Sequence, residues 1–175
     1  FNLTNKKIIL VTAHRRENFG KGISELCKSL KKIANQKRNI QIIYPVHPNP
    51  NIKNIVYKKL SNVNNINLIK PANYLDMVFL MMKSYLIVTD SGGIQEEAPS
   101  LFKPVIVLRD FTERPEVIKL GGGILVKRDN KIITKTINKI LYNVNVYKKM
   151  SSIKNPYGDG TASKKIIREI LKMRI

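Results

Sequence analysis

Short apolar runs alternate with helical patterns along the whole sequence, and this alternation constrains the fold more than any other feature. Six runs predict strands: KKIILVTA (6–13), NIQIIYPV (39–46), NINLIKP (65–71), YLIVTD (85–90), KPVIVLRD (103–110) and GGILVK (122–127). Helical periodicity separates them at residues 22–36, 51–61 and 74–84, and most of the tail from Asn130 to Ile175 is also predicted to be helical. Strands separated by helices are typical of a parallel, doubly wound sheet. We therefore predict an α/β fold with about six strands.

The length of 175 residues is enough for one domain with its own hydrophobic core, and no linker or internal repeat interrupts it. No apolar run approaches the roughly 20 residues that span a bilayer, so we expect no membrane segment. The first residues lack the pattern of a signal peptide and begin without methionine, which suggests a fragment or a processed product. The single cysteine, Cys27, cannot form an internal disulfide, and this favours a reducing cytoplasm.

The net charge of +20 would suit a nucleic acid or an anionic membrane surface. The lysines, however, are scattered through KSLKK, KNIVYKK, KMSSIK and SKK, aromatic residues make up only 7%, and no nucleic-acid motif is present. The sequence is also rich in Ile and Asn, as an AT-rich coding background would produce. We interpret the charge as compositional drift and expect no nucleic-acid partner.

Ligands of doubly wound sheets bind at the carboxyl ends of the strands, so the loops that follow the predicted strands are the place to look for a site. The loops of interest are AHRREN (13–18), PVHPNP (45–50), DSGG (90–93) and RDFTERPE (109–116). The glycine run 121–123 leads into a strand, and we interpret it as a structural turn.

The segment TDSGGIQEEAPSL combines a predicted helix start with nearby carboxylates. Glycines let the backbone approach a ligand closely, and free N–H groups at a helix start bind phosphate. With Ser91 as the N-cap, the third helical position is Ile94, so no reciprocal capping box uses up the amide donors. Glu97 follows Gly93 on the same helical face, about 5 Å further along, where it can accept hydrogen bonds from a vicinal diol. This layout fits a nucleotide, and the alternative is a plain tight turn with a serine cap.

The loop AHRREN places five polar side chains directly after the first strand: His14, Arg15, Arg16, Glu17 and Asn18. Histidine can transfer protons or donate to a phosphate, and arginine can bind phosphate oxygens in bidentate fashion. A salt-bridge network at a helix start is the structural alternative. Two consecutive arginines cannot both face one ligand, so one of them is expected to be structural or to serve another site.

Three other side chains lie near predicted strand ends. His47 and Arg114 each have two open interpretations, and Glu96 is interpreted as exposed or structural. His47 either takes part in the site or bonds the backbone, and Arg114, which precedes a helix-starting proline, either reaches a phosphate or pairs with Glu113 or Glu116. Glu96 points away from the diol position and is interpreted as an exposed or structural acid. Two histidines without a supporting Cys or Asp cluster do not make a metal site, so none is predicted.

Taken together, these loops resemble the non-hydrolysing UDP-N-acetylglucosamine 2-epimerases. VTAHRREN, YPVHPNP, TDSGGIQEEAPSL, RDFTERPE and NPYGDGTAS occur in the order and spacing expected of that family, over essentially all 175 residues. The resemblance implies a glycosyltransferase-B type fold, with a nucleotide sugar bound between two Rossmann-like domains. Residues 1–175 resemble the carboxyl-terminal, UDP-binding domain only. The amino-terminal domain, which carries the family's acid and base carboxylates, is absent from this sequence.

The resemblance implies interconversion of UDP-GlcNAc and UDP-ManNAc, by elimination of UDP through 2-acetamidoglucal and its re-addition, for cell-surface polysaccharide synthesis in the cytoplasm. It requires no cofactor, and it implies an amino-terminal domain or a homodimer as partner. The implied UDP contacts are the diphosphate at Ser91, Gly92 and Gly93, the ribose at Glu97, and the uracil at Ala72 and Met77. Arg114 is also implied to bind UDP, acting at the substrate. Family members often carry an aromatic residue at the Met77 position.

By the same resemblance, His14 is the candidate catalytic residue and aids departure of the UDP oxygen. Arg15 and His47 resemble residues that line a second, regulatory UDP-GlcNAc site in bacterial members. We expect the isolated chain to bind UDP weakly and not to epimerise. Two other interpretations are a UDP-sugar-dependent glycosyltransferase of the same superfamily, which should lack AHRREN, and a non-catalytic basic binding domain, whose affinity should fall steeply with salt.

Overall fold

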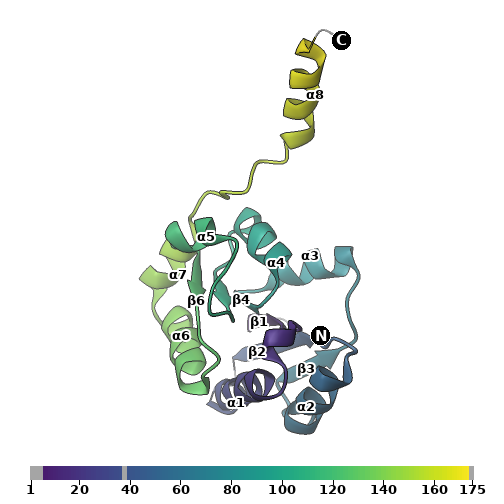
Figure 1. Ribbon diagram of the computed structural model, residues 1–175. Coiled ribbons are helices and arrows are strands. Elements are labelled where there is room, and N and C mark those ends of the chain that lie inside the picture. Colours follow the sequence, from purple (N-terminus) through teal and green to yellow (C-terminus); the bar gives the residue numbers. More distant parts are fainter. Residues whose placement is uncertain (1–5, 37–38, 174–175) are drawn as a thin grey trace.

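The computed structural model describes residues 6–36 and 39–173, which contain a six-stranded parallel sheet with helices on both faces (Figure 1). The strands are β1 (Lys7–Thr12), β2 (Ile40–Pro45), β3 (Ile66–Ile69), β4 (Leu86–Thr89), β5 (Val105–Val107) and β6 (Gly123–Leu125). Their order across the sheet is β3-β2-β1-β4-β5-β6, and every neighbouring pair is parallel. All six predicted strands and the doubly wound α/β fold are confirmed.

The two faces of the sheet bury alternate residues of each strand, because side chains of a strand point to opposite faces. In β1, Ile9 and Val11 join the core under α1 (Lys21–Gln36), α2 (Pro50–Leu60), α6 (Asn130–Tyr142) and α7 (Val144–Ser151). Ile8 and Leu10 join the core under α3 (Tyr74–Lys83), α4 (Gly92–Glu97) and the 3-10 helix η2 (Ala98–Leu101). Burial on both faces explains why these strands are continuous apolar runs without alternation.

The predicted helices are confirmed with small shifts of their ends. The predicted apolar face of α1 is fully packed, with Ile23, Leu26, Leu30 and Ile33 at most 1% exposed. Cys27 lies among them, and burial raises the pKa of its thiol to about 12. The predicted structural turn at residues 121–123 is also present: Gly121 has φ +82, and Ile153 occupies the place that a Cβ of Gly122 would take.

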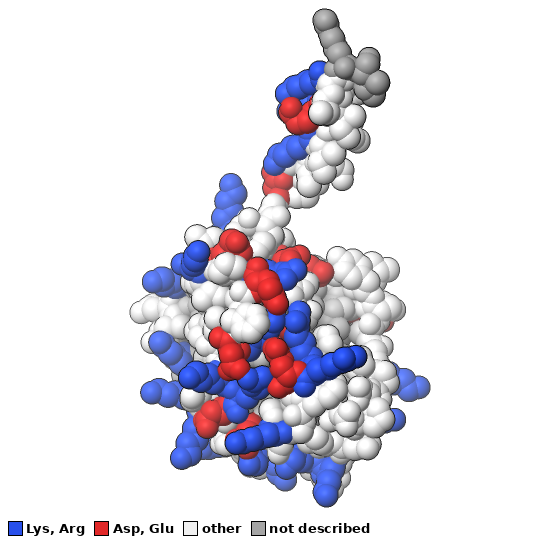
Figure 2. All heavy atoms as spheres, in the orientation of Figure 1, with Lys and Arg blue, Asp and Glu red and all other residues white. Residues whose placement is uncertain are grey.

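The last helix, α8 (Ala162–Lys172), extends away from the body on an irregular connection (Figure 1). None of its residues is buried, although Ile166, Ile167, Ile170 and Leu171 make one side of it strongly apolar. Lys and Arg side chains project from several sides of the body and from α8, as their scatter along the sequence predicts (Figure 2). Among the residues described, no helix has the length and apolar character needed to cross a bilayer.

Candidate functional site

The strand order places a crevice between the carboxyl ends of β1 and β4. The chain fills the sheet outward from β1 in one direction and from β4 in the other, so these two neighbours mark the topological switch point. Ligands of open α/β sheets bind at such a point, because the connections leave the strand ends in opposite directions there. The loops that flank it are residues 13–18 and 90–93, two of the four loops that the sequence indicated.

A pocket lies over this switch point. Its lining consists of Thr12, His14, Pro45, His47, Pro71, Ala72, Met77, Ser91 and Ile94. Five of these were predicted site residues: His14, His47, Ala72, Met77 and Ser91. They come from the ends of β1, β2 and β4, from the loop after β3 and from α3, so residues far apart in sequence meet in one concave site.

The start of α4 has the form of a phosphate cradle. Ser91 is its N-cap, as predicted, but the serine hydroxyl makes no capping hydrogen bond. The Ser91 N–H donates to Thr89 Oγ1 at 2.9 Å, so this amide is not available to a ligand. The N–H groups of Gly92, Gly93 and Ile94 precede the first intrahelical hydrogen bond, which the N–H of Gln95 donates to the Ser91 carbonyl. The two glycine N–H groups and the Ser91 hydroxyl can therefore donate to an anion.

Arg114 lies directly over this cradle. A Cβ added to Gly92 would be 3.2 Å from Arg114 Cζ, so the absence of a side chain at Gly92 lets the guanidinium approach. The Arg114 Nε atom donates to Glu96 Oε1 at 2.6 Å, and its Nη1 atom is 3.7 Å from Glu113 Oε2. Glu96 is thus a structural acid, as predicted, while the main partner of Arg114 is neither Glu113 nor Glu116.

Glu97 lies one turn beyond the cradle on the predicted face. A Cβ added to Gly93 would be 3.8 Å from Glu97 Oε1, which confirms that the two positions share a side of α4. Partial burial, and then the nearby charge of Glu96, raise the pKa of the Glu97 carboxyl. A partly desolvated carboxylate is a strong acceptor for hydroxyl groups.

The loop after β1 is held by a buried carboxylate that the sequence reasoning did not select. Asp90 is 0% exposed and accepts from the backbone N–H of His14 at 2.9 Å, from that of Arg15 at 2.9 Å, and from Asn18 Nδ2 at 2.6 Å. Its other oxygen lies 3.6 Å from His14 Nδ1. An acid between a buried strand and a cap serine was the available signal, because such an acid must find donors at the sheet edge.

His14 and His47 stand face to face. Their ring centroids are 5.6 Å apart and the ring planes differ by 13°. The His47 Nδ1 atom also accepts from the backbone N–H of Asn49 at 3.2 Å, so both interpretations of this residue have support: it bonds the backbone and it lines the pocket.

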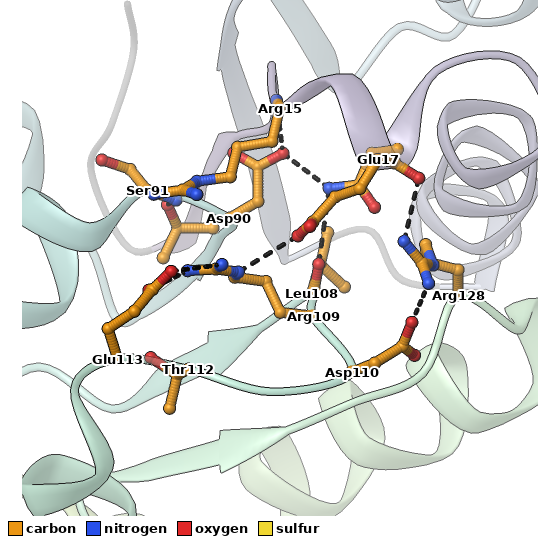
Figure 3. A network of polar contacts seen from close by, with 12 residues as sticks. Arg15, Glu17, Asp90, Ser91, Leu108, Arg109, Asp110, Thr112, Glu113 and Arg128 are labelled. Atoms are coloured by element: carbon orange, nitrogen blue, oxygen red, sulfur yellow. Dashed lines mark hydrogen bonds and ion pairs between the residues drawn. The ribbon is translucent and has the colours of Figure 1, made fainter.

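A second network ties residues 109–114 to residues 14–18 (Figure 3). It agrees in part with the salt-bridge network given as the structural alternative for the AHRREN loop, although its central residue, Arg109, was not selected from the sequence. The Arg109 guanidinium is 2% exposed and donates to both oxygens of Glu113 at 2.5 and 2.9 Å and to Glu17 Oε1 at 3.1 Å. The hydrogen bond from Arg109, with a contribution from the Arg15 charge, holds the pKa of Glu113 at about 2. Arg128 adds a bond to the Glu17 carbonyl at 2.8 Å and pairs with Asp110. Within the described ranges, no group of three or more His, Cys, Asp or Glu could hold a metal ion.

Known proteins match both the sequence and the fold. A family model described as UDP-N-acetylglucosamine 2-epimerase matches residues 1–171. The UDP-N-acetylglucosamine 2-epimerase of Salmonella typhimurium is 48% identical over 171 residues, which are 98% of this chain and 46% of the relative. That of Campylobacter jejuni is 51% identical over 168 residues, 96% of this chain and 44% of the relative. This chain therefore spans about half the length of the curated relatives it matches.

Solved structures of similar proteins have the same fold as this chain. The Neisseria meningitidis UDP-GlcNAc 2-epimerase bound to UDP-GlcNAc superposes with a TM-score of 0.93 at 47% identity, covering 96% of this chain and 45% of that one. The S. aureus MnaA–UDP structure also gives 0.93, at 40% identity, with 96% and 46% covered. The carboxyl-terminal domain of a Francisella tularensis group 1 glycosyl transferase shares the fold, with a TM-score of 0.69 at 16% identity. The predicted resemblance is confirmed.

Proposed function

Because the chain belongs to the UDP-N-acetylglucosamine 2-epimerase family, we propose that it forms the UDP-binding half of an enzyme that interconverts UDP-GlcNAc and UDP-ManNAc. The observation that carries the proposal is the order in which three features lie along one edge of the sheet. An apolar pocket contains Ala72 and Met77, the cradle with two backbone donors lies beside it, and the Glu97 carboxylate follows one turn later.

Each part of this edge suits one part of UDP. The uracil would pack against Ala72 and Met77, whose thioether supplies polarizable contact where an aromatic ring would supply stacking. The diphosphate would accept from the N–H groups of Gly92 and Gly93 and from the Ser91 hydroxyl. The ribose diol would donate to Glu97.

The same groups would favour breakage of the bond between C1 and the UDP oxygen. Negative charge develops on the leaving diphosphate as this bond breaks, and preorganised donors at that position lower the barrier. Arg114 lies over the cradle and His14 lines the adjoining pocket, so Arg114 would stabilise the charge while the His14 imidazole donates to the departing oxygen. Removal of the C2 proton needs a base, and we assign none in this chain.

We place the missing acid and base in a second, amino-terminal domain. Two observations support this division: the chain spans about half of its relatives, and the apolar side of α8 has no partner within the residues described. Residues 1–175 are then the carboxyl-terminal domain, and a homodimer is a further level of assembly consistent with it. We also propose a cytoplasmic location, where the buried thiol of Cys27 would stay reduced.

A regulatory role for Arg15 and His47 belongs to the same proposal. His47 stacks on His14. A second UDP-GlcNAc molecule bound against His47 would therefore be separated from His14, the proposed catalytic residue, only by the His47 ring. Arg15 follows His14 directly and shares its anchor on Asp90.

Titration calorimetry of the purified 175-residue chain with UDP tests the binding half of this proposal. We expect weak, saturable binding of UDP, and no binding would contradict the proposed function. In parallel, proton NMR of UDP-GlcNAc incubated with the chain should show no UDP-ManNAc. Product formed by the chain alone would contradict the division of labour between two domains.

A further inference from the structure

The irregular connection between α7 and α8 is anchored to the body next to the proposed diphosphate site. It carries NPYGDGT, residues 155–161, part of a motif to which the proposed function assigns no role. Ile153 packs where a Cβ of Gly122 would be, and Asn155 and Tyr157 are both partly buried. Residues 155–157, which we name the clasp, therefore lie against the body, whereas α8 beyond them does not.

The Tyr157 hydroxyl fastens the start of α5 (Pro115–Lys119), where Arg114 is the N-cap residue. It donates to the Arg114 carbonyl at 3.1 Å and accepts from the Val117 N–H at 3.2 Å. The Arg114 side chain makes no capping hydrogen bond, so the tyrosine hydroxyl takes the place of a cap. Burial raises the pKa of Tyr157, so the hydroxyl keeps its proton and remains a donor.

Asn155 is hydrogen-bonded to α4 and η2. Its Nδ2 atom donates to the Glu96 carbonyl at 3.3 Å and to Ser100 Oγ at 2.5 Å, and its Oδ1 atom accepts from the Tyr157 N–H at 2.9 Å. The clasp thus holds the backbones of both Glu96 and Arg114, the two residues whose side chains pair at 2.6 Å over Gly92.

We propose that the clasp positions Arg114 over the phosphate cradle, so that Asn155 and Tyr157 are positioning residues for the diphosphate of UDP. The inference rests on the proposed function, because it takes Arg114 as a diphosphate ligand. Its physical basis is preorganisation: an arginine whose backbone and counter-ion are already fixed loses less conformational freedom when the ligand arrives. Without the Tyr157 hydroxyl, the start of α5 loses the hydrogen bonds at the Arg114 carbonyl and the Val117 N–H that fix its position.

The test is a double-mutant cycle on UDP affinity, using the 175-residue chain and the variants Tyr157→Phe, Arg114→Gln and both together. Tyr157→Phe removes two hydrogen bonds, one to the Arg114 carbonyl and one from the Val117 N–H. We expect UDP affinity to fall by about 3- to 10-fold, the net effect of one hydrogen bond, because only part of their loss reaches the Arg114 side chain. In the Arg114→Gln background the same change should have no further effect, because the residue it positions is gone. Tyr57→Phe, which removes a tyrosine hydroxyl from α2, is the matched control and should bind UDP like the parent chain.

Asn155→Ala provides a second route if Tyr157→Phe folds poorly, and it should show the same dependence on Arg114. Unchanged UDP affinity in both folded clasp variants overturns the inference while leaving the proposed function intact. A loss that persists in full in the Arg114→Gln background also overturns it, since the clasp would then act by other means. If the parent chain fails to bind UDP, the proposed function falls, and the clasp inference falls with it.

Discussion

The backbone N–H of His14 lies 2.9 Å from one oxygen of the buried Asp90 carboxylate, and the Nδ1 atom of the same histidine lies 3.6 Å from the other oxygen. Asp90 also precedes Ser91 directly, so one residue joins the loop that carries the histidine to the start of the proposed phosphate cradle. The two loops at the switch point therefore keep a fixed relation to one another.

Replacement of Asp90 should destabilise the fold. Asp90→Ala leaves the N–H groups of His14 and Arg15 and the Asn18 amide without their acceptor, which predicts a loss of about 2–3 kcal/mol in the free energy of unfolding. Urea denaturation measures it. Asp110→Ala is the control, because Asp110 is 51% exposed and its pair with Arg128 should contribute less than about 1 kcal/mol. Equal losses in the two variants would contradict the role given to Asp90.

A methyl group at Gly92 should weaken UDP binding without lowering the stability of the fold. In Gly92→Ala the new Cβ would lie 3.2 Å from Arg114 Cζ and would push the guanidinium off the cradle. Alanine is also the better helix former, so the chain should fold at least as stably as the parent. We expect weaker UDP binding in calorimetry with an undiminished melting temperature. Parent-like UDP affinity would show that Arg114 does not depend on its place over Gly92.

Glu113 should make the chain sensitive to acid. Its pKa falls from 4.5 to about 2 through the Arg109 hydrogen bond, so its contribution to stability is present above about 4.5 and is lost as the pH falls towards 2. Glu113→Gln should lower stability near neutral pH and flatten its dependence on pH within that window. Urea midpoints measured across the window provide the check, and parallel curves for parent and variant would refute it.

The Glu97 carboxylate should affect the pH dependence of stability in the direction opposite to that of Glu113. Burial and Glu96 raise its pKa above 4.5, so the folded state favours the protonated form, and the ionised form reduces stability as the pH rises through the raised value. Glu97→Gln should therefore be more stable than the parent near neutral pH, with the difference vanishing below about 4.5. The same variant should bind UDP about 10- to 100-fold more weakly, because a charged acceptor for the ribose is lost. A variant less stable than the parent at neutral pH would be the contrary result.

The fold was predictable because its strands are buried on both faces and so stand out as continuous apolar runs such as IILV and LIVT. The rule that ligands lie at strand ends was enough to select Ser91 and His14. The switch point itself required the strand order, which the sequence does not contain.

Residues whose role depends on distant partners were missed. Asp90 bonds a backbone 76 residues away, and Arg109 bonds Glu17 across 92 residues, so neighbouring residues do not reveal these partners. Only Asp90 has a local signal, its position between a buried strand and a cap serine. For Arg114 the sequence left open a phosphate contact or a pair with Glu113 or Glu116. Its side chain does lie 3.7 Å from Glu113 Oε2, but the shorter bond goes to Glu96 on another helix. Helix geometry placed Glu97 correctly because that relation is local.

The most direct test of the account is an NMR titration of the isotope-labelled chain with UDP, which reports on each backbone amide separately. We predict saturable shifts of the Gly92 and Gly93 amides, and their loss in the variants Ser91→Ala and Glu97→Gln at the same UDP concentration. Shifts that fall instead on the lysine-rich surface of α1 and α2, or that persist unchanged in both variants, would contradict the assignment of the cradle to UDP.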